Sequence, residues 1–152
     1  MTLTTLFESQ EAYSEEFGNF LADIRSDIED YIAHYQAQKK SKMLIIGKFI
    51  EAQRQFPQRS SEFNKFGRIL SNQGWNKDHI NLGYSAYKEY KKLKENGNEI
   101  FARLADEASP TILMLINRAG LHTVGYDAAM YLKRTGRVPT KNQIIQRIKR
   151  LL

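Results

Sequence analysis

The chain contains no cysteine among its 152 residues. A disulfide framework, a zinc site built on thiolates and a cysteine nucleophile are therefore excluded. No apolar run approaches the roughly 18 residues needed to span a membrane, and the segment MLIIGKFI is far too short. The N-terminal MTLTTLFESQ lacks the basic start and apolar core of a secretory signal. We therefore expect a cytoplasmic protein.

Residue patterns typical of catalysis are also missing. The histidines His34, His79 and His122 are far apart and fit no metal-ligand spacing such as H-E-x-x-H. Tyr84 and Tyr87 have no neighbouring set of Arg and His that would activate a tyrosine for DNA strand transfer. There is no Gly-rich phosphate loop, internal repeat or carboxylate cluster suited to a metal. We expect neither an enzyme nor a bound cofactor.

No segment shows strand-like alternation between turn signals, whereas apolar residues recur at helical spacing along most of the chain. The 41% of hydrophobic residues suffices for a core, and the length suits one domain, or one domain plus an extension. The sequence thus predicts an all-α fold. We expect a multi-helix domain with a helix-turn-helix-like hairpin and a long N-terminal amphipathic helix.

That N-terminal helix is predicted over about 9–38. Apolar residues alternate at spacings of four and three along it, widened by Phe20 and Ile32: Phe17, Leu21, Ile24, Ile28, Tyr31 and Tyr35. A strict seam is typical of a coiled coil, whereas a widened one favours packing on the protein's own body. Both arrangements could hold in a dimer.

Charge divides the chain unevenly. Residues 1–30 hold eight acidic residues and one basic residue, a balance of −7, whereas the remaining 122 residues hold 22 basic and nine acidic, a balance of +13. We interpret 1–42 as an acidic amphipathic helix for packing or dimerisation and 43–152 as a basic helical domain. A positive body favours a polyanion such as nucleic acid.

The segment 60–93 is predicted to be a helical hairpin. Ser60 or Ser61 is a suitable N-cap for its first helix, Gly74 suits the turn, and Asn76 can cap a second helix over about 77–93. The first helix has one apolar face formed by Phe63, Phe66, Ile69 and Leu70.

The second helix of the hairpin carries a polar stripe at spacings of four, four, three and four: Lys77, Asn81, Ser85, Lys88 and Lys92. In a helix-turn-helix the second helix lies in the major groove, where Asn can read adenine and Lys can read guanine. Leu70 stands where the motif usually has a small residue, and Gly83 and Trp75 are also unusual at their places. The alternative is a plain hairpin whose stripe is a solvated face.

Capping signals place the remaining helices. Pro57 ends a helix over 43–56, Asn98 can cap a helix over 98–107, and Ser109-Pro110 opens an almost wholly apolar helix that should be buried. Thr123 can cap the next helix, which Gly136 ends, and Pro139-Thr140 opens the last. The loop between these two helices is basic, and we expect Arg134, Arg137 and Lys141 to contact DNA phosphates.

About a third of the chain, 43–93, resembles a group of uncharacterised bacterial plasmid and phage proteins. Their pattern is IGKxLxEAK…F…WL…GWS…Y, and the matching residues here are Ile46, Gly47, Lys48, Glu51, Ala52, Phe66, Gly74 and Trp75. Those proteins are thought to contain a helix-turn-helix, somewhat like the central domain of ParB-type partition proteins. The resemblance implies DNA binding on a mobile element and no enzymatic activity. The region around Tyr84 departs from the pattern.

Two hypotheses of function follow. The first is a DNA-binding protein, a regulator or plasmid- or phage-associated factor, that uses helix 77–93 as its recognition helix and acts as a dimer. The second is a protein-interaction module, an adaptor or inhibitor, that binds a partner through the acidic N-terminal helix. The second requires the seam of 17–35 to be exposed in the monomer.

Overall fold

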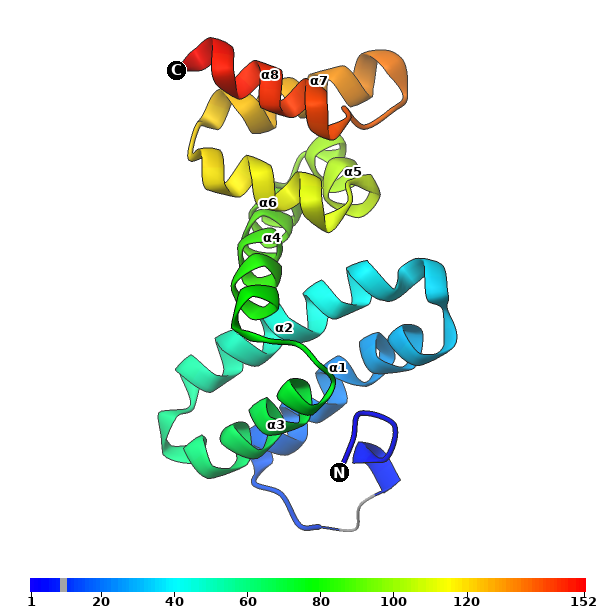
Figure 1. Ribbon diagram of the computed structural model, residues 1–152, viewed down its shortest axis with the longest axis vertical. Helices are drawn as coiled ribbons and strands as arrows, with labels where there is room; N and C mark the ends of the chain where they lie inside the picture. Colours follow the sequence, from blue (N-terminus) through cyan, green and yellow to red (C-terminus); the bar gives the residue numbers. More distant parts are fainter. Residues whose placement is uncertain (9–10) are drawn as a thin grey trace. The chain divides into compact units, whose positions relative to one another are not determined.

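The computed structural model describes residues 1–8 and 11–152, and these residues form helices, turns and loops without a strand (Figure 1). The predicted all-α, multi-helix fold is therefore confirmed. Short 3-10 turns lie at Leu6–Glu8, Tyr35–Ala37 and Pro57–Arg59. The α-helices are α1 (Glu15–Ala33), α2 (Gln38–Gln55), α3 (Ser60–Asn72), α4 (Lys77–Glu95), α5 (Glu99–Glu107), α6 (Pro110–Ala119), α7 (His122–Thr135) and α8 (Lys141–Leu151). None of the described helices combines the length and the apolar character needed to cross a membrane.

The chain forms two compact units, Met1–Tyr84 (unit 1) and Ser85–Leu152 (unit 2), and the division between them falls within α4. The charge pattern placed a boundary after residue 42 instead. The contacts divide the chain elsewhere because α1 packs along α2, which makes the acidic N-terminal helix part of unit 1.

The apolar seam of α1 is the core of unit 1. Its first four members are buried against α2 and α3, together with Phe20: Phe17, Leu21, Ile24 and Ile28. Tyr31 is half-buried, whereas Tyr35 is 87% exposed beyond the end of α1. The expected packing of this helix on its own body is therefore correct. The interaction-module hypothesis requires this seam to be exposed, and its burial contradicts that requirement.

The predicted start and end of the first helix differ from the structure. The expected start at Ser9 lies outside the described residues, and α1 begins after the N-cap Ser14, whose side-chain oxygen accepts a hydrogen bond from the Phe17 N–H. The helix ends at Ala33 because His34 has an extended backbone conformation. The polar stretch after it supplies the first turns of α2, which starts at Gln38.

Helices α3 and α4 form on either side of the predicted turn, and all four residues of the predicted apolar face of α3 are buried: Phe63, Phe66, Ile69 and Leu70. Gly74 adopts a φ of 85°, and the Asn76 side chain caps α4 by accepting from the His79 N–H at 3.0 Å. The capping role predicted for Ser60 or Ser61 is wrong. Both serines are already helical, because α3 continues directly from the 3-10 turn Pro57–Arg59.

Gly83 lies where α4 comes close to α2. A Cβ atom at Gly83 would lie 2.9 Å from the Cδ1 atom of Ile46 in α2, closer than real carbon contacts allow. The backbone of α4 therefore approaches α2 so closely that a side chain at this position would require Ile46 to shift. Leu70 is accommodated in the core, where it is 1% exposed.

Part of the acidic face of α1 is paired within unit 1. Lys48 of α2 donates to the Asp27 carboxylate at 2.9 Å and lies 3.7 Å from Asp23, and Arg59 lies 3.2 Å from Glu16. Burial alone would lower the pKa of Lys48, but the hydrogen bond and charge of Asp27, with Asp23 beyond it, raise this pKa above the usual lysine value. These pairs fix α1 against the basic residues of its own unit.

Unit 2 is assembled from short capped helices. Asn98 and Ser109 cap α5 and α6 as predicted, and Gly120 and Gly136 end α6 and α7 in the left-handed conformation. The predicted Thr123 cap is wrong, because α7 already begins at His122 after Leu121, which contributes no side-chain cap. Within the unit, α5 packs on α7, and α8 packs on α6 and α7. The helix predicted to be buried, α6, buries Ile112, Leu113 and Ile116, whereas Met114 and Leu115 are half-buried.

Candidate nucleic-acid interface

The predicted polar stripe lies on α4, with Lys77 and Asn81 in unit 1 and the other three residues in unit 2. Four of its members are exposed, whereas Ser85 is half-buried: Lys77, Asn81, Lys88 and Lys92. The apolar residues Ile80 and Tyr84 pack against the core of unit 1. The start of α4 therefore turns its apolar side inward and its Lys and Asn side chains toward solvent.

Contacts with α2 hold the start of α4 in place. The Nζ atom of Lys42 lies 2.8 Å from Nδ1 of His79 and 5.1 Å from the ring centre of Trp75. Trp75 is buried and packs edge-on against Tyr31. Burial lowers the pKa of Lys42. The protonated amine can only donate, so this contact favours the His79 tautomer in which Nδ1 carries no proton. His79 therefore serves to join the start of α4 to α2.

Positive charge is concentrated in unit 2. Unit 1 holds ten basic and eleven acidic side chains, a formal charge of −1, whereas unit 2 holds thirteen basic and six acidic, a formal charge of +7. The acidic α1 thus offsets the basic residues of its own unit. An excess of this size on a unit of 68 residues is a basic footprint of the kind that nucleic-acid-binding domains carry.

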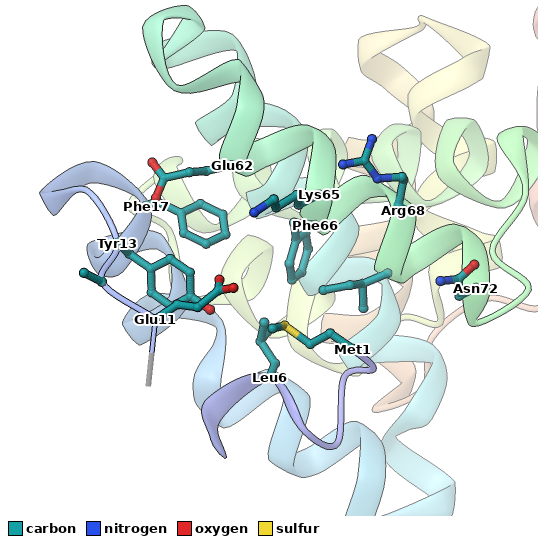
Figure 2. Close-up of a pocket in the computed structure, with 12 residues that line it drawn as sticks. Met1, Leu6, Glu11, Tyr13, Phe17, Glu62, Lys65, Phe66, Arg68 and Asn72 are labelled. Carbon is teal, nitrogen blue, oxygen red and sulfur yellow. The ribbon is translucent and has the colours of Figure 1, made fainter. Parts of the chain in front are cut away.

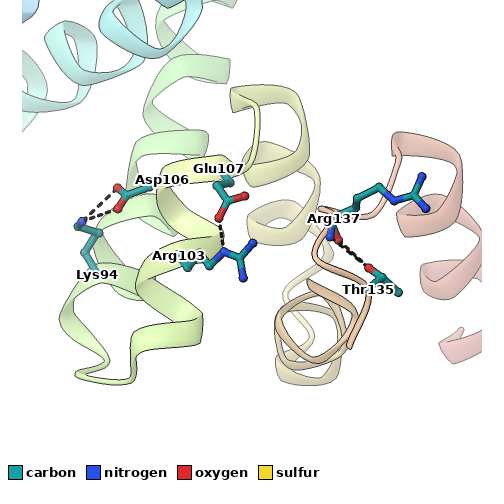
Figure 3. A network of polar contacts seen from close by, with 6 residues as sticks. All are labelled: Lys94, Arg103, Asp106, Glu107, Thr135 and Arg137. Atoms are coloured by element: carbon teal, nitrogen blue, oxygen red, sulfur yellow. Dashed lines mark hydrogen bonds and ion pairs between the residues drawn. The ribbon is translucent and has the colours of Figure 1, made fainter. Parts of the chain in front are cut away.

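The loop between α7 and α8 displays the three C-terminal residues expected to contact phosphates. Arg134, Arg137 and Lys141 are all exposed. In the described part of the chain, no carboxylate lies within ion-pair distance of them, whereas other cations of the unit are paired, Lys94 with Asp106 at 3.0 Å and Arg103 with Glu107 (Figure 3). The structure therefore leaves these three charges available to an external anion.

Local hydrogen bonds define the shape of this loop. The Arg137 N–H donates to Oγ1 of Thr135 at 3.2 Å, and the Arg137 side chain extends away from Thr135 (Figure 3). Thr135 in turn donates to the Tyr131 carbonyl at 2.7 Å. The guanidinium of Arg134 lies 5.8 Å from the Tyr131 ring centre, a cation–π distance. The loop is thus a fixed turn that presents cations.

A cavity that the sequence did not predict lies within unit 2. It has a volume of about 470 Å³, and α4, α5, α6 and the start of α7 contribute its walls. Its most buried charged group is Glu89, which is 5% exposed and bonds to the Asn117 side chain. A signal was present in the sequence, since Glu89 lies at helical spacing between the buried Ala86 and Leu93.

Burial raises the pKa of the Glu89 carboxyl, although the charge of Lys92, the hydrogen bond with Asn117 and the charge of His122 oppose that rise. A raised pKa in the folded state means that Glu89 contributes stability below its unfolded value, near 4.5, and that this contribution is lost as pH rises through the folded pKa. We therefore expect Glu89→Gln to raise the free energy of unfolding at pH 8 by on the order of 1 kcal/mol.

Urea unfolding followed by circular dichroism from pH 4 to pH 8 tests this prediction. The advantage of Glu89→Gln should shrink as pH falls, because the native carboxyl then becomes neutral as well. Lys92→Gln is the matched control, since it removes an attraction to the ionised carboxylate and should destabilise at pH 8. If Glu89→Gln is instead less stable than the native chain at pH 8, the interactions of the ionised carboxylate with its neighbours contribute more free energy than its burial costs.

A second cavity, of about 420 Å³, lies in unit 1 beneath α3. Leu6, Phe17 and Phe66 give it an apolar floor, and charged residues of both signs line it (Figure 2). One of them, Glu62, accepts from the Ser14 N–H at 3.0 Å and from the Ser14 hydroxyl, so it serves to fix the start of α1. No group of His, Cys, Asp and Glu suited to a metal ion occurs in residues 1–8 and 11–152.

Comparison of the chain with protein-family models, curated proteins and solved structures gives no match. The assignment of a function therefore depends on the residues and contacts described above.

Proposed function

We propose that this protein binds double-stranded DNA. The observation that carries the proposal is the formal charge of +7 on unit 2, with Arg134, Arg137 and Lys141 exposed and outside any ion pair of the described residues. Cations of this kind bind phosphates and release counterions from the DNA. The three residues set the position of the protein on the DNA backbone.

Helix α4 contributes the remaining proposed contacts. The exposed Lys77 and Asn81 at its start have the chemistry to reach base edges or phosphates, and Lys88 and Lys92 add positive charge in unit 2. Ser85 is half-buried, so its share of the interface is smaller. The capped start of α4 after a tight turn supports its role as a recognition helix, because the N-terminal residues of such helices contact bases.

In this proposal the protein is a regulator or a plasmid- or phage-associated factor, and it acts as a homodimer. Two copies would place equivalent helices at successive half-sites, which doubles the number of phosphate contacts. Analytical ultracentrifugation with and without duplex DNA measures that stoichiometry.

The first test of the proposal is fluorescence anisotropy of the full chain with a labelled random duplex, titrated from about 50 mM to about 200 mM salt. We expect the logarithm of the affinity to fall linearly with the logarithm of salt concentration. Its slope would give the number of phosphates contacted, because each contact contributes about −0.9 on duplex DNA. A chain that binds no duplex even at the lowest salt would refute DNA binding.

A further inference from the structure

Helix α8 presents a second polar stripe, which the sequence interpretation did not use. Its outward residues recur at spacings of four, three and one, and all are exposed: Asn142, Gln146, Lys149 and Arg150. On a helix these positions fall within about a 100° arc. The stripe combines two amides with two cations.

The opposite side of α8 is fixed to the body of unit 2. Ile144 is buried, and Ile145 and Ile148 are half-buried. Two polar contacts with α7 also hold α8. Gln143 donates to the Tyr131 hydroxyl at 3.2 Å, and Arg147 lies 2.6 Å from Asp127. Because Gln143 and Arg147 are four residues apart on one face, they fix the rotation of α8 about its axis.

The start of α8 is also fixed. Thr140 and Gln143 form a reciprocal capping box, in which the Gln143 side chain accepts from the Thr140 N–H at 2.8 Å and the Thr140 hydroxyl accepts from the Gln143 N–H at 3.2 Å. Helix α8 packs on both α6 and α7 and follows α7 after a short turn (Figure 1). In three-helix DNA-binding domains, the helix in this position reads the major groove.

We infer that α8 is a base-reading helix, which inserts its stripe of Asn142, Gln146, Lys149 and Arg150 into the major groove of DNA. This inference rests on the proposed DNA binding and adds a second recognition element to it. Asn and Gln side chains form paired hydrogen bonds with adenine, and Lys and Arg bind guanine O6 and N7. The Arg134, Arg137 and Lys141 cations beside the helix would hold it on the backbone.

The fit to duplex DNA is supported by size and charge. An α-helix with its side chains is about 10–12 Å across, and the major groove is about 12 Å wide. Helix α8 contains no acidic residue, and the Asp127 carboxylate of α7 that lies beside it is paired with Arg147. The formal charge of +7 on unit 2 adds a general attraction to the DNA phosphates.

The test compares the full chain with its Asn142→Ala/Gln146→Ala variant in selection from a random duplex library. We expect the native chain to enrich a preferred sequence. The variant should bind random duplex within about threefold of the native affinity, because it keeps every cation, but its ratio of preferred to random binding should fall on the order of tenfold or more. The matched control is Gln58→Ala/Asn64→Ala, which removes two exposed amides from unit 1 and should change neither quantity.

Two outcomes distinguish this inference from the proposed function. If the native chain binds duplex but has no preferred sequence, or the amide variant keeps the native preference, α8 does not read bases and DNA binding stands. If the native chain binds no duplex at low salt, both proposals fail. The single variant Gln146→Ala repeats the comparison with a smaller change, and circular dichroism confirms that each variant keeps its helix content.

Discussion

Replacing Phe63 with alanine is expected to lower the free energy of unfolding of unit 1 by about 4 kcal/mol, the range for deleting a fully buried aromatic side chain. Phe63 is 0% exposed and lies 5.2 Å from Phe17 and 5.3 Å from Phe20, ring centre to ring centre. Such aromatic pairs contribute about 0.5–1.5 kcal/mol of stability beyond that gained from burying their apolar surface. Three helices contribute to this cluster, so a cavity there weakens the contacts of α1, α2 and α3 together.

Urea unfolding followed by tryptophan fluorescence measures this effect. The chain has one tryptophan, Trp75, which is 4% exposed in the core of unit 1, so its emission reports on that unit. Tyr35→Ala is the control, because Tyr35 is 87% exposed and its loss should change stability by less than about 0.5 kcal/mol. A Phe63→Ala variant within about 1 kcal/mol of the native chain would contradict the tight packing of the cluster.

The helices could be predicted because their signals are local. Apolar spacing and caps within a few residues place α3 at Ser60–Asn72 and α4 at Lys77–Glu95, close to the expected ranges. Gly136 and Thr140 likewise mark the end of α7 and the start of α8. A Ser or Thr near a helix start is a weaker signal, because several adjacent positions can serve as the cap. The predicted caps at Ser60, Ser61 and Thr123 fail because α3 and α7 begin one or two residues earlier, after Arg59 and Leu121, without a side-chain cap.

Features that depend on distant contacts could not be predicted. Gly83 stood out in the sequence, but the structural reason for a glycine there is the close approach of α4 to Ile46, which lies 37 residues earlier. The boundary after residue 42 was drawn from charge, whereas compactness depends on α1 packing along α2. Charge shows which segments attract a polyanion and does not show which helices share a core.

The candidate interface was predicted in part. Composition and spacing identified exposed cations on α4 and in the loop after α7, because a polar stripe opposite an apolar face is a local property. The same pattern on α8 was not used, because its isoleucines dominate the segment and its C-terminal cations resemble ordinary helix capping. Only the packing of α8 on α6 and α7 shows which of its faces remains outside.

Reversing Arg134, Arg137 and Lys141 to glutamate should lower affinity for a random duplex on the order of a hundredfold to a thousandfold near 100 mM salt. Each cation that contacts a phosphate contributes about one to the slope of log affinity against log salt, so the slope should fall by about three. This readout separates direct contacts from a general loss of positive charge. A lower net charge alone would reduce the affinity, but it would not lower the salt slope by three, because the number of phosphate contacts would be unchanged.

The matched control is the triple reversal of Lys39, Lys65 and Arg68, three exposed cations of unit 1. It changes the net charge by the same amount, so long-range attraction falls equally in both variants. Arg134→Glu also places a negative charge in the last turn of α7, which costs about 0.3–1 kcal/mol through the helix dipole. Thermal unfolding must therefore show that the C-terminal variant is folded at the assay temperature. Equal losses of affinity and slope in the two variants would mean that DNA responds to total charge and that the loop after α7 is not the contact.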